Sequence, residues 1–218
     1  GSWDIDTAAL ELLEGVIEAA GTRYAERIFL RLPSESPLVL LARRAGFFPY
    51  FEELLLQSRE SMLGPGAAPA PAGLTGRLPQ DDYSLFQLFS AATPQTVRAA
   101  MGLTFDQWRD AHEPHTRGRR EWVVSSKGRI TGWLGLSRGR RAKEAEVLVH
   151  PDHSDLWRGL VELALAHGGL RRWLVPDYQT ITADILLGHG FYETGRFTML
   201  IKTVAVPVMS LGMAPVEA

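Results

Sequence analysis

Two arginine clusters stand out in the sequence. Residues 117–120 and 138–141 both read RGRR. A guanidinium group binds phosphates and carboxylates through paired hydrogen bonds, so both clusters suit an anionic ligand. They flank a predicted hairpin, whose strand ends lie side by side. Six arginines should therefore gather at one end of a sheet. They form either an anion or nucleic-acid site, or a solvated edge that Glu121 and Glu144 neutralise.

The histidines form two pairs with three-residue spacing. His112 and His115 make one pair, and His150 and His153 make the other. A zinc site needs three or four converging ligands, and the chain has no cysteine to supply thiolates. We therefore predict no metal site and expect these histidines in loops and at the surface.

The composition is that of a globular protein. Of the 218 residues, 45% are apolar and 22% are charged, and 23 basic against 25 acidic residues give a net charge of −2. This balance argues against nucleic acid and anionic membranes as partners. The chain has neither an apolar run of about 20 residues nor a signal pattern, so we expect no membrane span and a cytoplasmic location.

Apolar spacing, prolines and capping residues predict alternating helices and strands. The first part should contain, in order, a helix, a strand, a helix and a strand at 7–21, 27–32, 37–46 and 47–56. Short helices should begin near residues 81, 94 and 104. Strands are then expected at 121–125, 130–136 and 144–150, followed by a helix, a strand, a helix and a strand at 155–167, 171–175, 180–187 and 191–206.

A linker separates these two parts. Of the 13 residues 64–76, 11 are Gly, Ala or Pro, and such a run cannot bury enough apolar surface to order itself. We therefore predict a linker over 64–79. The expected division of the chain is a half-domain, this linker, a full domain and a tail, at 1–63, 64–79, 80–206 and 207–218.

The end of the second part repeats the element order of the first. At an offset of 144, residues 13–58 and 157–202 share 8 identities, and Gly46-Phe47 meets Gly190-Phe191. This indicates an internal repeat. Either roughly 80 upstream residues supply the missing strands of the first copy, in line with one repeat length, or its sheet edge is borrowed from residues 80–206 or from another copy.

Residues 80–206 resemble the GNAT N-acetyltransferase family. Three strands precede a helix, a strand, a helix that ends in Gly190-Phe191, and a long strand; residues 149–152 (VHPD) are also family-like. The 144-residue offset resembles tandem GNAT proteins. The resemblance implies an α/β (α+β) fold, with a mixed, mostly antiparallel sheet, helices on both faces, and a partial second GNAT half at the N-terminus.

The family resemblance implies an acyl-CoA-dependent N-acyltransferase. Its substrates would be acetyl-CoA or another acyl-CoA, and a small-molecule or protein amine. The pantetheine arm would pair with the end of the third strand, and the pyrophosphate would lie at the start of the next helix. The positions that match this site are Leu148, Val149, His153, Ser154, Trp157, Arg158 and Gly159. Glu146 matches the position of the family's general base and shares a strand face with Leu148 and His150.

The sequence departs from the family pattern at three positions. Asp155 and Trp157 stand where glycines are expected. Leu186 stands where the family has the tyrosine that acts as general acid. A second hypothesis is therefore a catalytically inactive GNAT-fold binding or structural module. A third is an anion or nucleic-acid binder that uses the two arginine clusters. Sheet edges also offer a route to a homodimer.

Overall fold

The computed structural model describes residues 5–59, 70–112, 119–138, 143–167 and 169–204. One compact unit is residues 50–198, and the other combines residues 1–49 with 199–218. The helices are α1 (Ile5–Thr22), α2 (Leu38–Arg44), α3 (Asp82–Ala92), α4 (Gln95–Met101), α5 (Phe105–His112), α6 (Leu156–Ala166) and α7 (Thr180–Gly188). The 3₁₀ turns are η1 (Pro79–Asp81) and η2 (Pro151–His153). The strands are β1 (Arg27–Pro33), β2 (Phe48–Gln57), β3 (Leu74–Gly76), β4 (Arg120–Ser126), β5 (Arg129–Arg138), β6 (Lys143–Val149), β7 (Arg172–Pro176) and β8 (Tyr192–Thr203).

The unit 50–198 contains an antiparallel sheet in the order β3-β4-β5-β6. The expected hairpin joins β4 to β5. Its two loop residues, Lys127 and Gly128, have φ angles of 50° and 77°. Positive φ at both loop positions gives the tight turn whose twist matches that of the flanking strands. The turn places Ser125 opposite Ile130, and a β-bulge between Val124 and Ser125 then shifts the register so that Trp122 lies opposite Leu134.

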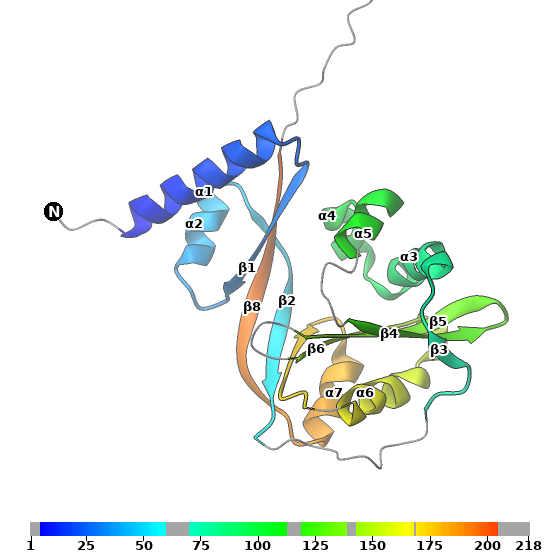
Figure 1. Ribbon diagram of the computed structural model, residues 1–218. Coiled ribbons are helices and arrows are strands. Elements are labelled where there is room, and N and C mark those ends of the chain that lie inside the picture. Colours follow the sequence, from blue (N-terminus) through cyan, green and yellow to red (C-terminus); the bar gives the residue numbers. More distant parts are fainter. Residues whose placement is uncertain (1–4, 60–69, 113–118, 139–142, 168, 205–218) are drawn as a thin grey trace, which may run out of the picture. The chain divides into compact units, whose positions relative to one another are not determined.

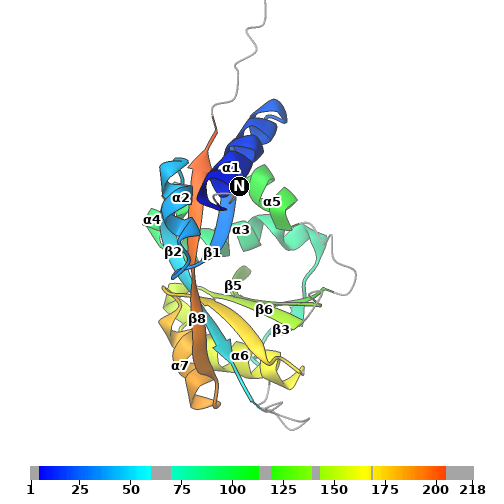
Figure 2. The ribbon, with the colours of Figure 1, turned by 90° about the vertical axis from the view of Figure 1, so that its left-hand side faces the viewer.

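Helices cover both faces of this sheet (Figures 1 and 2). Side chains alternate along a strand, so Val123 faces one side and Val124 the other. Val123 packs with residues of α3 and α5, including Leu85 and Trp108. Val124 belongs to a larger core on the other face, with residues of β5, β6, β7, α6 and α7. These residues include Leu134, Val147, Trp173, Leu160, Ala164 and Leu186.

A second sheet has the order β1-β8-β2-β7. β2 runs antiparallel to β7, in a register from Glu53 opposite Pro176 to Gln57 opposite Arg172. β6 and β7 are neighbours, yet they lie at the ends of two different sheets. The edge of β6 that faces away from β5 therefore has no strand of its own sheet beside it.

The other unit builds a small core from the two ends of the chain. β1 pairs with β8, and Leu13 and Ile17 of α1 pack against a cluster formed by Ala42, Phe47 and Leu200. The sheet neighbour of β1 is therefore β8, a strand that belongs to residues 80–206. The Lys202 ammonium also donates a 2.8 Å hydrogen bond to the carbonyl of Ala45 at the end of α2.

One face of α1 stays exposed within this unit. Leu12 and Val16 are 70% and 42% exposed. At the 144-residue offset Val16 corresponds to Leu160 of α6, which is fully buried against β5. The Leu160 methyl packs so closely over Gly132 that a Cβ at Gly132 would lie 2.9 Å from it. The described residues of the first unit supply no such sheet beneath Val16.

The predicted linker is wrong over its second half. Residues 74–76 form β3, in which Leu74 pairs with Val124 and Gly76 with Trp122, and η1 follows at 79–81. Main-chain pairing needs no large side chain, so the low apolar content did not reveal this short edge strand. Residues 60–69 lie outside the described residues. The compact units also divide the chain elsewhere than at 63 and 80, since β2 and β8 each have residues in both units.

The other expected helices and strands are confirmed, with ends that differ by a few residues. Their apolar spacing is strong, and prolines or glycines mark most of their boundaries. In the described part of the chain, no helix combines the length and the apolar character that a membrane crossing requires.

Candidate functional site

Glu146 lies near the middle of β6, opposite Gly135 of β5. Its side chain is 55% exposed, and its Oε2 lies 3.5 Å from Nη2 of Arg119. Arg119 is only 15% exposed and also lies 3.5 Å from Glu121, so it keeps an ion-pair partner without Glu146. The exposed Glu146 carboxylate can therefore turn to a ligand on this face of the sheet.

The main chain of β6 presents alternate residues to its open edge. The amide of His150 donates a 2.8 Å hydrogen bond to the carbonyl of Thr131, which lies at the end of the β5 pairing. Main-chain N–H and C=O groups point to alternate sides along an antiparallel strand, so those of residues 144, 146 and 148 also point to β5. The groups of Ala145, Val147 and Val149 then point to the open edge. Of the two strand positions expected at the acyl-CoA site, Val149 presents its main chain there and Leu148 does not.

Gln179 reaches this edge from the loop before α7. Its side-chain amide donates a 3.2 Å hydrogen bond to the carbonyl of Val147. Gln179 therefore lies where an extended ligand would pair with β6. Gln179 is not among the site residues predicted from the sequence. The available signal was its position directly after a strand and before a helix, where polar loop residues often meet ligands.

The start of α6 follows β6 after a single 3₁₀ turn. The imidazole Nδ1 of His150 accepts a 3.3 Å hydrogen bond from the amide of Asp152. Asp155 is the N-cap of α6 but makes no side-chain cap hydrogen bond, and the amide of Trp157 bonds to the carbonyl of Ser154 at 3.3 Å. Ser154 and Asp155 are exposed and His153 is half-buried, so this turn faces solvent.

Gly159 has a packing role in the structure. A Cβ at this position would lie 2.9 Å from Pro71, so the glycine allows the segment before β3 to cross α6 closely. Trp157 is half-buried and packs against the core around α6. Arg158 is exposed, with its Nη1 3.5 Å from the Glu162 carboxylate. Of the expected phosphate-loop residues, His153, Ser154 and Arg158 keep polar groups accessible to a ligand.

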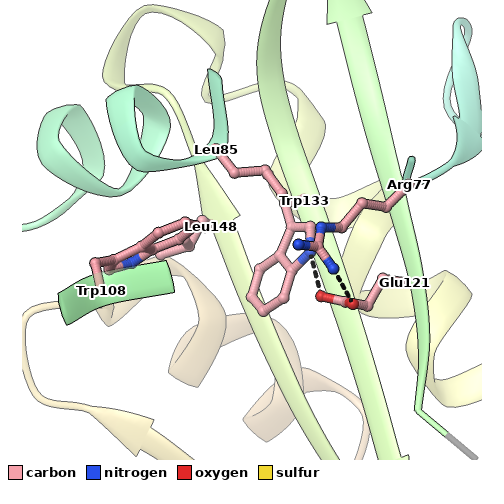
Figure 3. Close-up of a pocket in the computed structure, with 6 residues that line it drawn as sticks. All are labelled: Arg77, Leu85, Trp108, Glu121, Trp133 and Leu148. Atoms are coloured by element: carbon pink, nitrogen blue, oxygen red, sulfur yellow. Dashed lines mark hydrogen bonds and ion pairs between the residues drawn. The ribbon is translucent and has the colours of Figure 1, made fainter. Parts of the chain in front are cut away.

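Glu121 anchors an ion-pair cluster beside this site (Figure 3). Its carboxylate accepts hydrogen bonds from Arg77 at 2.8 Å and from the Trp133 indole at 3.1 Å, and Arg119 lies 3.5 Å away. Leu148 lines the same small cavity of about 10 Å³, which is no larger than one water molecule. The cluster is therefore packed too closely to hold a substrate.

The two arginine clusters are only partly described. Arg119 pairs with Glu121 and Glu146, and Arg120 lies over the ring of Trp122 at 5.4 Å. Arg119 and Glu121 are only 15% and 13% exposed, so this pair lies in a packed cluster, whereas Arg120 is exposed. The side chains of residues 117, 138, 140 and 141 lie outside the described residues.

His150 and His153 do not gather a third metal ligand among the described residues. The rings of His150 and His153 are 6.0 Å apart, and His150 lies 3.7 Å from the carboxylate of Asp152. No group of three His, Asp or Glu side chains suited to a metal ion occurs among the described residues. The side chains of His112 and His115 lie outside them.

Tyr178 lies in a buried polar cluster next to Gln179. Burial raises the pKa of its phenol, and the nearby acidic groups of Tyr50, Glu53 and Asp177 raise it further, while the Thr93 side chain acts in the opposite direction. Glu53 is only 7% exposed and comes from β2, where it pairs with Pro176 at the end of β7. The neutral phenol therefore persists to high pH, adjacent to the residue that occupies the β6 edge.

Solved structures share this arrangement of sheets and helices. A GCN5-related N-acetyltransferase from Sphaerobacter thermophilus is 16% identical, with a TM-score of 0.54 over 94% of this chain and 70% of that chain. The corresponding protein from Kribbella flavida is 14% identical, with a TM-score of 0.54 over 88% and 75%. A tandem GNAT protein from the clavulanic acid biosynthesis pathway is 15% identical, with a TM-score of 0.53 over 90% and 70%.

The fold is the GNAT fold. No protein-family model matches the sequence, and no curated protein is significantly similar to it. The GNAT fold class expected from the element order is thus confirmed: mostly antiparallel sheets carry helices on both faces. At 14–16% identity the likeness concerns the backbone arrangement, so the activity has to be argued from this chain's own residues.

Proposed function

We propose that the protein is an acyl-CoA-dependent N-acyltransferase. The observation that carries this proposal is the open edge of β6 beside β7, where two sheets of a GNAT fold end. An extended amide arm such as pantetheine can add to this edge as a strand would, through the main chain of Val147 and Val149. The thioester would then lie beside the strand that carries Glu146.

Glu146 is the proposed general base. The acceptor amine attacks the thioester carbonyl, a C–N bond forms, and the C–S bond to CoA breaks. The amine proton passes to the Glu146 carboxylate, directly or through one water, and the leaving thiolate is protonated by solvent. The exposure of Glu146 supports this role, because the carboxylate is accessible from the face where the acceptor must approach.

The proposed phosphate contacts differ from a glycine-rich loop. Asp155 and Trp157 keep the chain from approaching phosphates closely, and Gly159 is covered by Pro71. The pyrophosphate would instead meet the first main-chain amides of α6 together with His153, Ser154 and Arg158. We infer weaker CoA binding than a glycine loop allows. A small-molecule or protein amine is the proposed acceptor.

A non-catalytic GNAT-fold module is the second candidate. The hydrogen bond from Gln179 to Val147 favours it, because this bond uses the acceptor that the pantetheine arm needs. The absence of a tyrosine at position 186 also favours it. In this case the β6 edge is a closed structural contact rather than a ligand site.

Calorimetric titration with acetyl-CoA separates the two candidates. The acyltransferase requires saturable binding with one site per chain, followed by release of free thiol when amines are added. The chain has no cysteine, so a thiol reagent added after the reaction detects only released CoA. Absence of heat and of a thermal shift at millimolar acetyl-CoA would refute the acyltransferase. Stoichiometric binding with amine-dependent thiol release would refute the inactive module.

A further inference from the structure

A second hollow lies between α3 and α4, and Leu103, in the segment after α4, completes it. Its volume is about 370 Å³, within the range of small-molecule sites. Phe86, Phe89 and Leu103 form its apolar wall, and Ser90, Gln95 and Arg98 supply polar groups. None of these residues takes part in the proposed acyl transfer.

Arg98 is held in place at the rim of this hollow. Its Nε donates a 3.2 Å hydrogen bond to the carbonyl of Thr93, which leaves both terminal nitrogens of the guanidinium available. Among the described residues, no carboxylate forms an ion pair with Arg98 and no acidic side chain lines the hollow. By contrast, Arg77 and Arg119 both pair with Glu121. Among the described residues that line the hollow, the only charge is therefore the Arg98 guanidinium, which the Thr93 carbonyl holds in position.

The aromatic wall is also held rigidly. The rings of Phe86 and Phe89 are stacked with centroids 6.4 Å apart, and both contact the buried Trp108, at 5.6 and 6.2 Å. Both phenylalanines are half-buried and present a preformed apolar surface beside the guanidinium. Such a surface binds a flat or aliphatic body with little loss of side-chain entropy.

We propose that this hollow binds a small organic carboxylate with an aromatic or aliphatic body. The carboxylate forms a bidentate pair with the terminal nitrogens of Arg98, since two parallel N–H donors match its two oxygens. The body lies on Phe86 and Phe89. The hydroxyl of Ser90 and the amide of Gln95 hydrogen-bond any polar substituent. Binding at this site does not depend on acyl transfer, so the two proposals stand or fall separately.

The test is a calorimetric titration of the full chain with 4-phenylbutyrate, and with its neutral amide as the matched ligand. We expect saturable binding of the acid with a Kd at or below about 1 mM, and binding of the amide at least 10-fold weaker. Equal binding of acid and amide would overturn the proposal, because Arg98 would then contribute nothing. Absence of binding of the acid at 10-fold higher concentration, about 10 mM, would also overturn it.

Three variants locate the site. Arg98→Gln should weaken binding of 4-phenylbutyrate at least 10-fold, since it keeps hydrogen-bond donors but removes the charge. Ala99→Phe, on an exposed lining position of α4, should block the hollow without disturbing a core. Arg129→Gln, at the exposed hairpin, should change nothing. Unchanged affinity in both the Arg98 and Ala99 variants would place the ligand elsewhere and refute the assignment.

Discussion

The side-chain amide of Gln179 donates a 3.2 Å hydrogen bond to the main-chain carbonyl of Val147. This contact joins the loop after β7 to the open edge of β6, so one side chain bridges the place where the two sheets diverge. Any extended ligand that pairs with this carbonyl has to displace the glutamine. The glutamine and a ligand therefore compete for the same carbonyl of Val147.

Replacing Gln179 should accordingly strengthen ligand binding. We expect Gln179→Ala to increase the affinity for acetyl-CoA about 3- to 10-fold, because one intramolecular hydrogen bond no longer competes. Calorimetry measures the effect. Gln87→Ala, at an exposed position of α3, is the matched control and should leave the affinity unchanged. Weaker binding in Gln179→Ala would instead assign Gln179 a direct ligand contact.

Glu146→Gln should lower turnover without affecting acyl-CoA binding. Loss of a general base reduces the rate about 10²- to 10⁴-fold, while the amide keeps the shape of the side chain. We expect kcat for thiol release to fall within this range and the Kd for acetyl-CoA to change less than about 2-fold. Glu144→Gln, two residues earlier on the same exposed strand face, should behave as the unaltered chain. Equal losses in the two variants would exclude a specific role for Glu146.

Two positions related by the 144-residue offset should differ in their contribution to stability. Leu160→Ala removes a fully buried side chain from the sheet-facing side of α6 and should lower the free energy of unfolding by about 3–5 kcal/mol. Val16→Ala, at the corresponding exposed position of α1, should change it by less than about 0.5 kcal/mol. Urea unfolding followed by circular dichroism gives both values. A large cost for Val16→Ala would mean that another surface covers α1 in solution.

Tyr178 should make stability depend on alkaline pH. Because the folded-state pKa of this phenol is raised, its contribution is complete below the unfolded-state value of about 10 and declines as the pH rises through the folded-state pKa. We expect Tyr178→Phe to cost about 1 kcal/mol near pH 8, and we expect this difference to shrink above pH about 10.

Chemical unfolding of both proteins between pH 8 and 11 measures this change. Tyr83→Phe is the control, since its side chain is 59% exposed and the substitution should shift stability little at any pH in this range. A difference between Tyr178→Phe and the unaltered chain that stays constant, or widens, with rising pH would contradict the expected role of the buried phenol.

Most helices and strands could be predicted because apolar spacing and turn residues act over a few neighbouring positions. The apolar spacing of α6 and the turn at Lys127-Gly128 lie within short windows of sequence. β3 was not predicted because Leu74 and Thr75 follow a Gly/Ala/Pro run. A short edge strand forms through pairing with its neighbour, here β4, more than through its own side chains. The sequence equally does not contain the strand order β1-β8-β2-β7, since local propensity does not select a partner more than 100 residues away.

The candidate site was predictable where a single element carries it. Glu146 and Val149 follow from the alternation along β6, and His153 and Ser154 follow from the start of α6. Gln179, in contrast, meets Val147 only through the packing of β7 beside β6. The Tyr178 ring packs against Phe51, which β2 brings from more than 100 residues away. These are long-range contacts, and the sequence of neither segment indicates which partner it will meet.

The position of β8 between β1 and β2 has a consequence for biosynthesis. β8 comes from the distal end of the sequence, so on the ribosome β1 has no strand to pair with until Thr203 has emerged. A nascent chain halted earlier exposes the edges of both β1 and β2, and such edges recruit chaperones or other unfinished chains. Closure of this sheet therefore waits for β8, and the long sequence separation between β8 and its partners β1 and β2 makes it slow.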